Sequence, residues 1–391
     1  MKSVSKNLNS NISQKLFYLL VLVLFLRVDL VFENNTPTGG DMGAHIVAID
    51  TFIKDFMPNL QINGWSNDWF GGYPLYYFYF PLPAIITYIL NIVFSFGIAF
   101  KIMVVMSTIL VVYSIEKLMR KTSNQISIYG ATAGLFYVFT ESFTIYGGNL
   151  ASTLAGQFSF AYSLAFANLS IFYLIKSENN FRFTISSIFL ALCLLSHLIP
   201  FIIYSPIYAF YWLSKKQNLN QRILSIFIFL ALVSRWSVSL LMNLEYTTNM
   251  SYTPFSRLDD LIKKDILPII FILIGLLIAK HKNLIKYKTI NLFDLYIISS
   301  SVLLYFYVPE GALWNGRLVP FFNLGIIFLF FKAVEIFIDD INLYQQGVNV
   351  LTGLFLGGTI YCLYIFYDKW SNNESYLNLY IPIIFLIMIF A

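Results

Sequence analysis

The sequence predicts an all-α polytopic membrane protein with about 11–13 transmembrane helices and a long first extracytoplasmic loop that carries an interfacial amphipathic helix. Of the 391 residues, 58% are apolar and only 12% are charged, against roughly 45–50% and about 25% in soluble proteins. The mean hydropathy is +0.71. A soluble fold could not bury so much apolar surface with so few charges for its exterior. Residues 1–391 are therefore expected to form a single integral membrane domain.

The first span is predicted at the N-terminus. Residues 1–15 contain three lysines and precede an apolar segment from Leu16 to Phe32. Such a start is typical of a signal peptide, but no small-residue cleavage site follows the apolar segment. We therefore expect an uncleaved span of about 17 residues, just long enough to cross, with residues 1–15 as a cytoplasmic tail.

The later spans follow from further long apolar runs. The run 183–213 is too long for one helix and contains Pro200, so two helices are expected there. The last run ends the sequence, so a truncated C-terminus is also expected. The runs lie at 98–116, 126–143, 157–175, 183–213, 223–244, 266–279, 289–308, 318–338, 347–367 and 377–391.

The placement of Lys and Arg decides how the shorter run at 81–97 is read. If 81–97 is re-entrant or lies at the outer surface, about twelve crossings result and the basic clusters share one side, the cytoplasmic one. The loops 33–80, 144–156, 245–265 and 309–317 then lie outside. The clusters are Lys2/Lys6/Lys15, Lys117/Arg120/Lys121, Lys176/Arg182, Lys215/Lys216/Arg222 and Lys280/Lys282/Lys286/Lys288.

The first outer loop, residues 33–80, contains a predicted interfacial helix over 39–57. Asp41 and His45 are four residues apart and share one edge of that helix. Asp41 has two interpretations: a helix N-cap, or a general base with His45 beside it. Spacing alone favours the cap. The apolar face of the helix is formed by Met42, Ile46, Ile49, Ile53, Phe56 and Met57.

An aromatic segment, GWSNDWFGGYPLYYFYFPLP, follows at 64–83. An interfacial aromatic belt explains part of this composition. Asp68, which lies between Trp65 and Trp69, and the turn that leads into Tyr73 are not explained by a belt. Flat aromatic faces with an acid among them also suit a sugar or a polyprenyl chain, so Asp68, Trp69 and Tyr73 are candidate substrate-binding residues.

Three motifs carry a family resemblance: GGDMGAHI at 39–46, GWSNDWFGGYP at 64–74 and FYFPLP at 78–83. In this order and spacing they resemble the membrane family labelled pyruvoyl-tetrahydropterin-synthase-related. That family resembles GT-C-type glycosyltransferases, multipass enzymes that use polyprenyl-phosphate sugars on the extracytoplasmic face, and large mycobacterial cell-wall glycosyltransferases. The similarity continues at 147–158, 194–200 and 313–321, so a GT-C-like fold is expected.

The resemblance implies roles for individual residues. Asp41 matches the acid that such enzymes place after the first span as catalytic base or metal ligand, which favours catalysis over capping. His45 matches the motif as well. A phosphate-binding arginine is implied near Arg317, and a planar guanidinium suits a phosphodiester. Family members often have glutamate where this chain has Gln157, so an acid role there is lost.

Other candidates are read from their positions alone. Gly148, Asn149 and Ser152 lie at a glycine turn into a helix, which could seat a phosphate or serve close helix packing; the two interpretations are even. His197 lies where the 183–213 run must turn, a position more often taken by a helix-end partner than by a catalyst. Arg235 lies inside a span, where an arginine is a functional candidate or snorkels to the surface.

The predicted function is transfer of a sugar from a polyprenyl-phosphate donor to an extracytoplasmic glycan, lipid or protein acceptor, in a prokaryotic cell membrane. A multipass transporter or lipid flippase and a non-catalytic envelope-assembly protein are the alternatives. No cofactor is indicated, and use of a divalent metal is left open because one firm acid makes no binding site. Cys193 and Cys362 both lie in apolar runs, which excludes a disulfide framework. The net charge of +5 reports topology, and nucleic acid is excluded as a partner.

Overall fold

A computed structural model describes residues 23, 26–68, 71–122, 129–140, 145–176, 180–248, 261–262, 266, 270, 291–308 and 314–340. The spans predicted at 347–367 and 377–391, the cluster Lys280–Lys288 and most of the first span and of the 266–279 run lie outside these residues.

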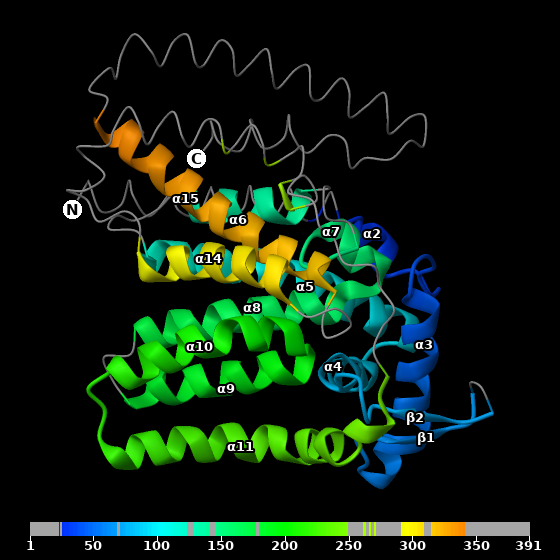
Figure 1. The fold of residues 1–391 in the computed structure, drawn as a ribbon. Helices are drawn as coiled ribbons and strands as arrows, with labels where there is room; N and C mark the ends of the chain where they lie inside the picture. The colour runs from blue at the N-terminus through cyan, green and yellow to red at the C-terminus, as the bar shows by residue number, and fades with distance from the viewer. Residues whose placement is uncertain are drawn as a thin grey trace, which may run out of the picture.

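The described residues form a helical bundle with a layer of shorter elements across one end (Figure 1). Four segments are long and apolar enough to cross a membrane: Phe96–Arg120, Leu150–Ile175, Leu219–Met242 and Asn315–Ala333. The prediction of a polytopic α-helical membrane protein is confirmed. The bundle helices are α5 (Phe96–Thr122), α6 (Tyr129–Phe139), α8 (Phe158–Ile175), α9 (Asn180–Ser196), α10 (Leu198–Ser214), α11 (Leu219–Met242), α14 (Leu292–Tyr307) and α15 (Val319–Asp340).

The long run at 183–213 forms two helices, as predicted. The break lies at His197, which ends α9 and is the N-cap of α10. Pro200 then falls in the first turn of α10, where proline costs no intrahelical hydrogen bond. The histidine cap, rather than the proline, therefore marks the turn between the two spans.

The ambiguous run at 81–97 does not span. Its helix, α4 (Leu82–Asn91), has only 10 residues, which corresponds to about 15 Å of helix, half of a bilayer's hydrocarbon core. In Figure 1 it is seen end-on while the bundle helices are seen from the side, so it lies across them.

The end layer contains the first loop. The helix α3 (Met42–Thr51) continues as a π-helical turn, Phe52–Phe56, and a 3₁₀ turn, Met57–Asn59. It crosses the end of the bundle (Figure 1). Met42, Ile49 and Phe56 of the predicted apolar face are buried in the core, as is Phe52, so this face packs on protein. The interfacial placement of the helix stays a prediction. The strands β1 (Gly64–Ser66) and β2 (Tyr73–Leu75) form an antiparallel hairpin beside it.

The remaining short elements complete the same end or connect to it. A four-residue helix, α2 (Val28–Val31), precedes the end layer. Lys101 of α5 holds the segment after α2, because its ammonium donates to the carbonyls of Leu30 (2.7 Å) and Glu33 (2.6 Å) and to Asn35 Oδ1 (2.8 Å). The others are α7 (Leu150–Ser152), a π-helical turn at Thr153–Gln157 and 3₁₀ turns at Leu244–Tyr246 and Asn315–Leu318.

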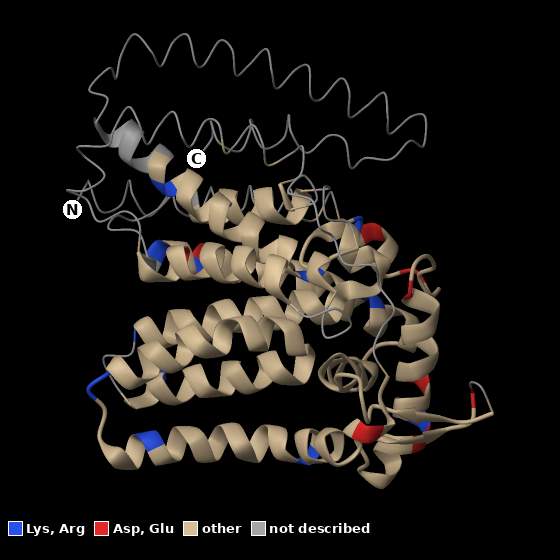
Figure 2. Cartoon of the chain, in the orientation of Figure 1, with Lys and Arg blue, Asp and Glu red and all other residues tan. Residues whose placement is uncertain are grey.

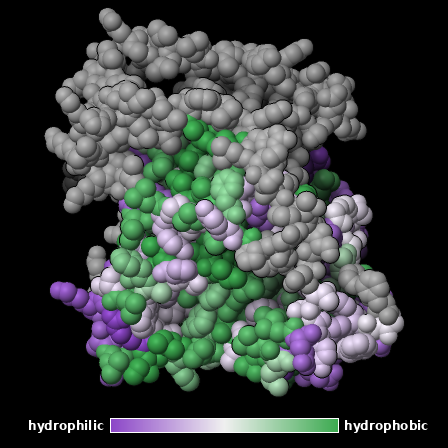
Figure 3. All heavy atoms as spheres, in the orientation of Figure 1, coloured by the Kyte–Doolittle hydropathy of each residue, from purple (hydrophilic) through white to green (hydrophobic). Residues whose placement is uncertain are grey.

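Charge separates the two ends of the bundle (Figure 2). The described basic clusters lie at the C-terminus of α5, around the α8–α9 connection and between α10 and α11, at the end opposite α3. In Figure 3 the face in view is broadly apolar between polar patches at the two ends. Apolar flanks between polar ends are expected of a protein that lipid surrounds.

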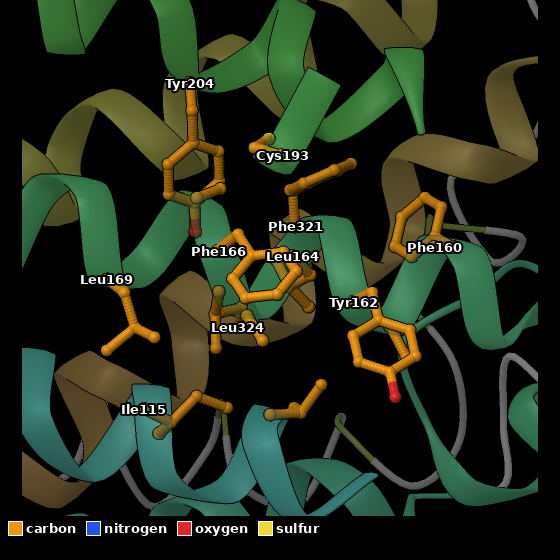
Figure 4. Packing of buried hydrophobic residues seen from close by; sticks show 14 of the residues in the cluster. Ile115, Phe160, Tyr162, Leu164, Phe166, Leu169, Cys193, Tyr204, Phe321 and Leu324 are labelled. Atoms are coloured by element: carbon orange, nitrogen blue, oxygen red, sulfur yellow. The ribbon is translucent and has the colours of Figure 1, made fainter. Parts of the chain in front are cut away.

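The core is centred on α8, which is buried along nearly its whole length. Its small residues, among them Ala161, Ser163 and Ala167, allow neighbouring helices to approach closely. In Figure 4, side chains from α5, α8, α10 and α15 meet around Leu164. Polar groups link the same helices: Asn168 accepts from the Tyr204 hydroxyl (2.6 Å) and donates to Ser114 Oγ (3.2 Å).

Candidate functional site

The backbone places Asp41 at the start of α3 with an exposed side chain that does not cap the helix. Its carboxylate accepts no hydrogen bond from the first turn, so the N-cap interpretation does not explain why an acid stands there. Its backbone N–H instead donates to the carbonyl of Ala155 (2.9 Å), and its Oδ2 accepts from Gln157 Nε2 (3.4 Å). Asp41 therefore faces a segment more than one hundred residues later in the chain.

His45 lies one turn along α3, on the same side as Asp41. Its ring packs against Phe158 (centroids 4.8 Å apart) and Tyr79 (5.5 Å). Burial lowers the pKa of His45 to about 4, although the charge of Asp41 and a hydrogen bond with the Gly156 backbone oppose this shift. The imidazole is consequently neutral at physiological pH, and the predicted Asp41–His45 pair is a carboxylate beside an uncharged ring.

Tyr79 connects the first loop to Arg317, and it is a site residue that sequence reasoning did not single out. Burial raises the pKa of its hydroxyl; the Ser159 hydroxyl and the charge of Arg317 lower it, and the charge of Asp41 raises it. Both charges therefore influence the pKa of this phenol. The only signal for this residue was its position inside the FYFPLP motif.

Arg317 comes from the 3₁₀ turn before α15 and closes the site from the far end of the chain. Its Nη1 donates to the carbonyls of Ile145 and Tyr146, both at 3.1 Å. Its guanidinium lies 5.9 Å from the ring of Trp314, and that ring packs edge-on against Tyr146 at 5.1 Å. The arginine thus holds the loop 145–146 in place as well as presenting its charge to the site.

His197 lies at the turn between α9 and α10. Its Nδ1 accepts from the backbone N–H of Ile199 (3.2 Å), which caps α10. The ring stacks on Phe80 at 4.7 Å and meets Phe160 edge-on at 5.3 Å. Burial and the charge of Arg317 lower the pKa of His197 to about 3. His197 is therefore a neutral helix cap next to Arg317, and the Nδ1 acceptor role leaves the ring proton on Nε2.

The glycine turn at 147–148 and the helix start after it are packed inside the protein. Asn149 and Ser152 are fully buried. Asn149 accepts from the Ser152 N–H (2.8 Å) and donates to the Thr140 carbonyl. Ser152 Oγ accepts from the Gly147 N–H (3.2 Å). A side chain on Gly148 would collide with the Tyr137 hydroxyl. Close packing accounts for these residues, and the phosphate seat predicted at Gly148, Asn149 and Ser152 stays a prediction.

The remaining candidates lie away from Asp41, near the other end of α3, about 15 Å along its axis. The Asp68 carboxylate accepts from Thr51 Oγ1 (2.5 Å) and Ser66 Oγ (3.0 Å), and these hydroxyls lower its pKa. It thereby fastens the β1–β2 hairpin, which includes Tyr73, to α3. Arg235 Nη2 donates to the Leu60 carbonyl (2.7 Å). Trp69 lies outside the described residues.

The described residues contain no group of three or more His, Cys, Asp or Glu side chains that could hold a metal ion. Use of a divalent metal stays a prediction.

Comparison with known proteins bears on the fold. No family model matches the chain, and no curated protein does. Among solved structures, the chain is similar to ArnT from Cupriavidus metallidurans in its apo state, with a TM-score of 0.53 and 12% identity over 97% of this chain and 75% of the ArnT chain. ArnT is a membrane glycosyltransferase of the GT-C type. The predicted GT-C-like fold is thereby confirmed, whereas the pyruvoyl-tetrahydropterin-synthase-related family finds no such support.

Proposed function

We propose that the protein is a glycosyltransferase that moves a sugar from a polyprenyl-phosphate donor to an acceptor hydroxyl on the extracytoplasmic side of the membrane. One observation carries the proposal: the segment 145–157 is contacted both by an exposed carboxylate that caps nothing, Asp41, and by a guanidinium, Arg317. Asp41 hydrogen-bonds Ala155 and Gln157, and Arg317 hydrogen-bonds the carbonyls of Ile145 and Tyr146. Asp41 and Arg317 are far apart in the sequence, and both contact the segment that leads into α8 in a GT-C-like bundle.

These two groups suit the two charges of such a transfer. Asp41 takes the proton of the acceptor hydroxyl while the oxygen of that hydroxyl bonds to the anomeric carbon of the donor sugar. The bond between that carbon and the phosphate oxygen breaks, and the polyprenyl phosphate leaves with the electron pair. Arg317 stabilises the negative charge on this leaving group, because hydrogen bonds from a guanidinium to a phosphate are charge-assisted.

The neutral histidines fit the same division of roles. His45 adds no positive charge beside Asp41, so the carboxylate keeps its basicity toward the acceptor. His197 adds none beside Arg317, where a second cation would repel the guanidinium. With Nδ1 occupied by the α10 cap, the Nε2–H of His197 is left as a donor for a phosphate or sugar oxygen.

The position of the site explains the choice of donor. The site lies at the end of the bundle opposite the basic clusters. Because the positive-inside rule assigns those clusters to the cytoplasm, the site is assigned to the extracytoplasmic face. Nucleotide sugars are cytoplasmic, so a donor presented on the outer face has to be carried by lipid. A transporter would instead be expected to place its unusual polar residues near the membrane midplane on broken helices.

The test is sugar transfer by the purified protein from a polyprenyl-phosphate sugar in detergent or nanodiscs. Asp41→Asn is nearly isosteric and removes the proton acceptor, so the rate should fall on the order of 10²–10⁴-fold with unchanged expression and melting temperature. Asp41→Ser should behave alike. Asp50→Asn, on the opposite edge of α3 in an exposed pair with Lys54, should retain wild-type activity. An Asp41→Asn enzyme with the wild-type rate would remove Asp41 from the mechanism.

A further inference from the structure

The helix that runs from Leu150 to Ile175 is broken next to Asp41. Residues Thr153–Gln157 form a π-helical turn in which Gly156 has φ +107° and ψ 0°, outside the helical region. Only glycine adopts such a φ without strain. Such a break costs intrahelical hydrogen bonds, and the contacts made at the break have to compensate for them.

The break and the Asp41 segment fit each other through several contacts. The Ala155 carbonyl, freed by the break, accepts from the Asp41 N–H at 2.9 Å. A Cβ on Gly156 would lie 2.9 Å from the Asp41 Cβ, and a Cβ on Gly40 would collide with the Ala155 carbonyl. The Gly156 backbone also hydrogen-bonds His45. Two glycines, one on each segment, therefore let the backbones meet where the acid begins α3.

Gln157 adds a side-chain contact to the acid itself. Its amide nitrogen donates to Asp41 Oδ2 at 3.4 Å. A glutamate at this position would bring a second carboxylate against the first, and two such groups cannot both ionise without cost. A glutamine instead offers a neutral donor that leaves Asp41 free to accept a proton from substrate.

We propose that the break at Ala155–Gln157 sets the position of Asp41, and that Gln157 is a positioning residue which orients its carboxylate. This inference rests on the proposed role of Asp41 as the base. The sequence alone showed Gln157 only as the loss of an acid. The inference gives glutamine a positive role beside the Asp41 carboxylate.

The first experiment compares pH–rate profiles of the wild-type protein, Gln157→Glu and Gln157→Met in the transfer assay. Gln157→Glu should move the acid limb of the profile upward by about one pH unit, because its charge opposes ionisation of Asp41. Gln157→Met keeps the length of the side chain and adds no charge. It should lower the rate about tenfold through the lost hydrogen bond, without that upward movement.

The second experiment needs no activity. Melting temperatures of Gln157→Glu, Asp41→Asn and the double variant are measured from pH 4 to pH 8. Repulsion between two carboxylates grows as both ionise, so Gln157→Glu should lose stability relative to wild type as the pH rises. The Asp41→Asn background should abolish this loss. A loss that persists without the Asp41 charge would show that residue 157 does not act on Asp41.

The outcomes separate the two proposals. If Asp41→Asn is inactive while both Gln157 variants match the wild type in rate and pH profile, the positioning role is wrong and the base stands. If Asp41→Asn is fully active, the base is wrong and the positioning role falls with it, whatever the melting temperatures show. An upward movement of the acid limb together with an Asp41-dependent loss of stability supports the inference.

Discussion

At the residue scale, His45 and His197 illustrate how burial decides the charge of a site. Both rings lie among aromatic side chains, and desolvation is the largest cause of the lowered pKa values of about 4 and about 3. Each stands beside one of the two charged groups, Asp41 or Arg317. Protonation of either histidine would change the electrostatics that the proposed transfer depends on.

His197 gives a prediction for stability against pH. Because its pKa in the folded protein lies below its ordinary value of 6.5, the unfolded chain binds the extra proton, and its contribution to stability is lost as the pH falls from about 6.5 toward 3. His197→Asn keeps an N-cap and removes the titration. Its melting temperature should lie below that of the wild type at pH 7.5, because the ring's packing on Phe80 and Phe160 is lost. Between pH 7.5 and pH 4.5 it should fall less than that of the wild type. Equal falls in both proteins would contradict the assigned charge state.

Arg317 gives a prediction for catalysis. Arg317→Lys retains the charge but not the planar set of donors that a phosphate accepts from. We expect a loss of transfer rate on the order of 10²-fold with little change in melting temperature. The alternative is that Arg317 serves only to hold the carbonyls of Ile145 and Tyr146. In that case the melting temperature should fall, and the rate of the surviving folded protein should stay near that of the wild type.

At the element scale, α11 anchors the first loop through three distant hydrogen bonds. Arg235 donates to the Leu60 carbonyl, Trp236 Nε1 donates to the Tyr79 carbonyl (2.9 Å), and Asn63 donates to Ser239 Oγ (2.8 Å). Trp236 also packs on Phe80 at 5.5 Å. The span thereby positions Tyr79, and through it the region between Asp41 and Arg317. Arg235 is thus part of a structural contact at the outer end of its helix.

The helices α14 and α15 are joined by a buried ion pair that gives a prediction at this scale. Lys332 Nζ lies 2.6 Å from Asp294 Oδ2, with side chains 1% and 0% exposed. Lys332→Met alone leaves a buried, unpaired carboxylate and should cost about 3–5 kcal/mol of unfolding free energy. Asp294→Asn combined with Lys332→Met should recover most of it. A double variant that melts as low as the single one would show that the pair itself stabilises the contact.

At the scale of the whole molecule, the two ends of the bundle differ in composition. One end holds α3, the hairpin and the Asp41–Arg317 site, and the other holds the described basic clusters. This asymmetry is what the positive-inside rule reads as orientation. The same assignment of sides therefore sets both the topology of the protein and the face on which the proposed chemistry takes place.

Cysteine labelling in intact cells tests that hypothesis. Single cysteines at Leu60 and Tyr246, which are 73% and 71% exposed at the α3 end, should react with an impermeant maleimide. Cysteines at Phe181 and Leu219, which are 72% and 70% exposed at the opposite end, should react only after permeabilisation. The background lacks Cys193 and Cys362. The reverse pattern would place the site in the cytoplasm and remove the reason for a lipid-linked donor.

Much of the fold could be predicted because it depends on local properties of the chain. Apolar run lengths predicted spanning helices and the break within 183–213, and the placement of Lys and Arg predicted that 81–97 does not fully cross. Lys and Arg positions separated the two ends. These properties are read from each segment alone, since a segment's transfer into lipid depends mainly on its own side chains. The Asp41 helix was likewise predictable from its apolar periodicity.

The partners of the polar residues were decided by the tertiary structure. Sequence spacing favoured a cap for Asp41, but its carboxylate faces Gln157 and does not cap α3. Side-chain caps are instead found on other helices, where Asn149 caps α7 and His197 caps α10. Asn149 accepts from the Ser152 N–H, and Arg317 donates to carbonyls 171 and 172 residues away. Short polar side chains can hydrogen-bond to whatever lies within about 3 Å. The sequence by itself therefore determined which described segments are long, apolar helices and predicted the end at which the candidate residues gather, while long-range packing decided which partners those residues have.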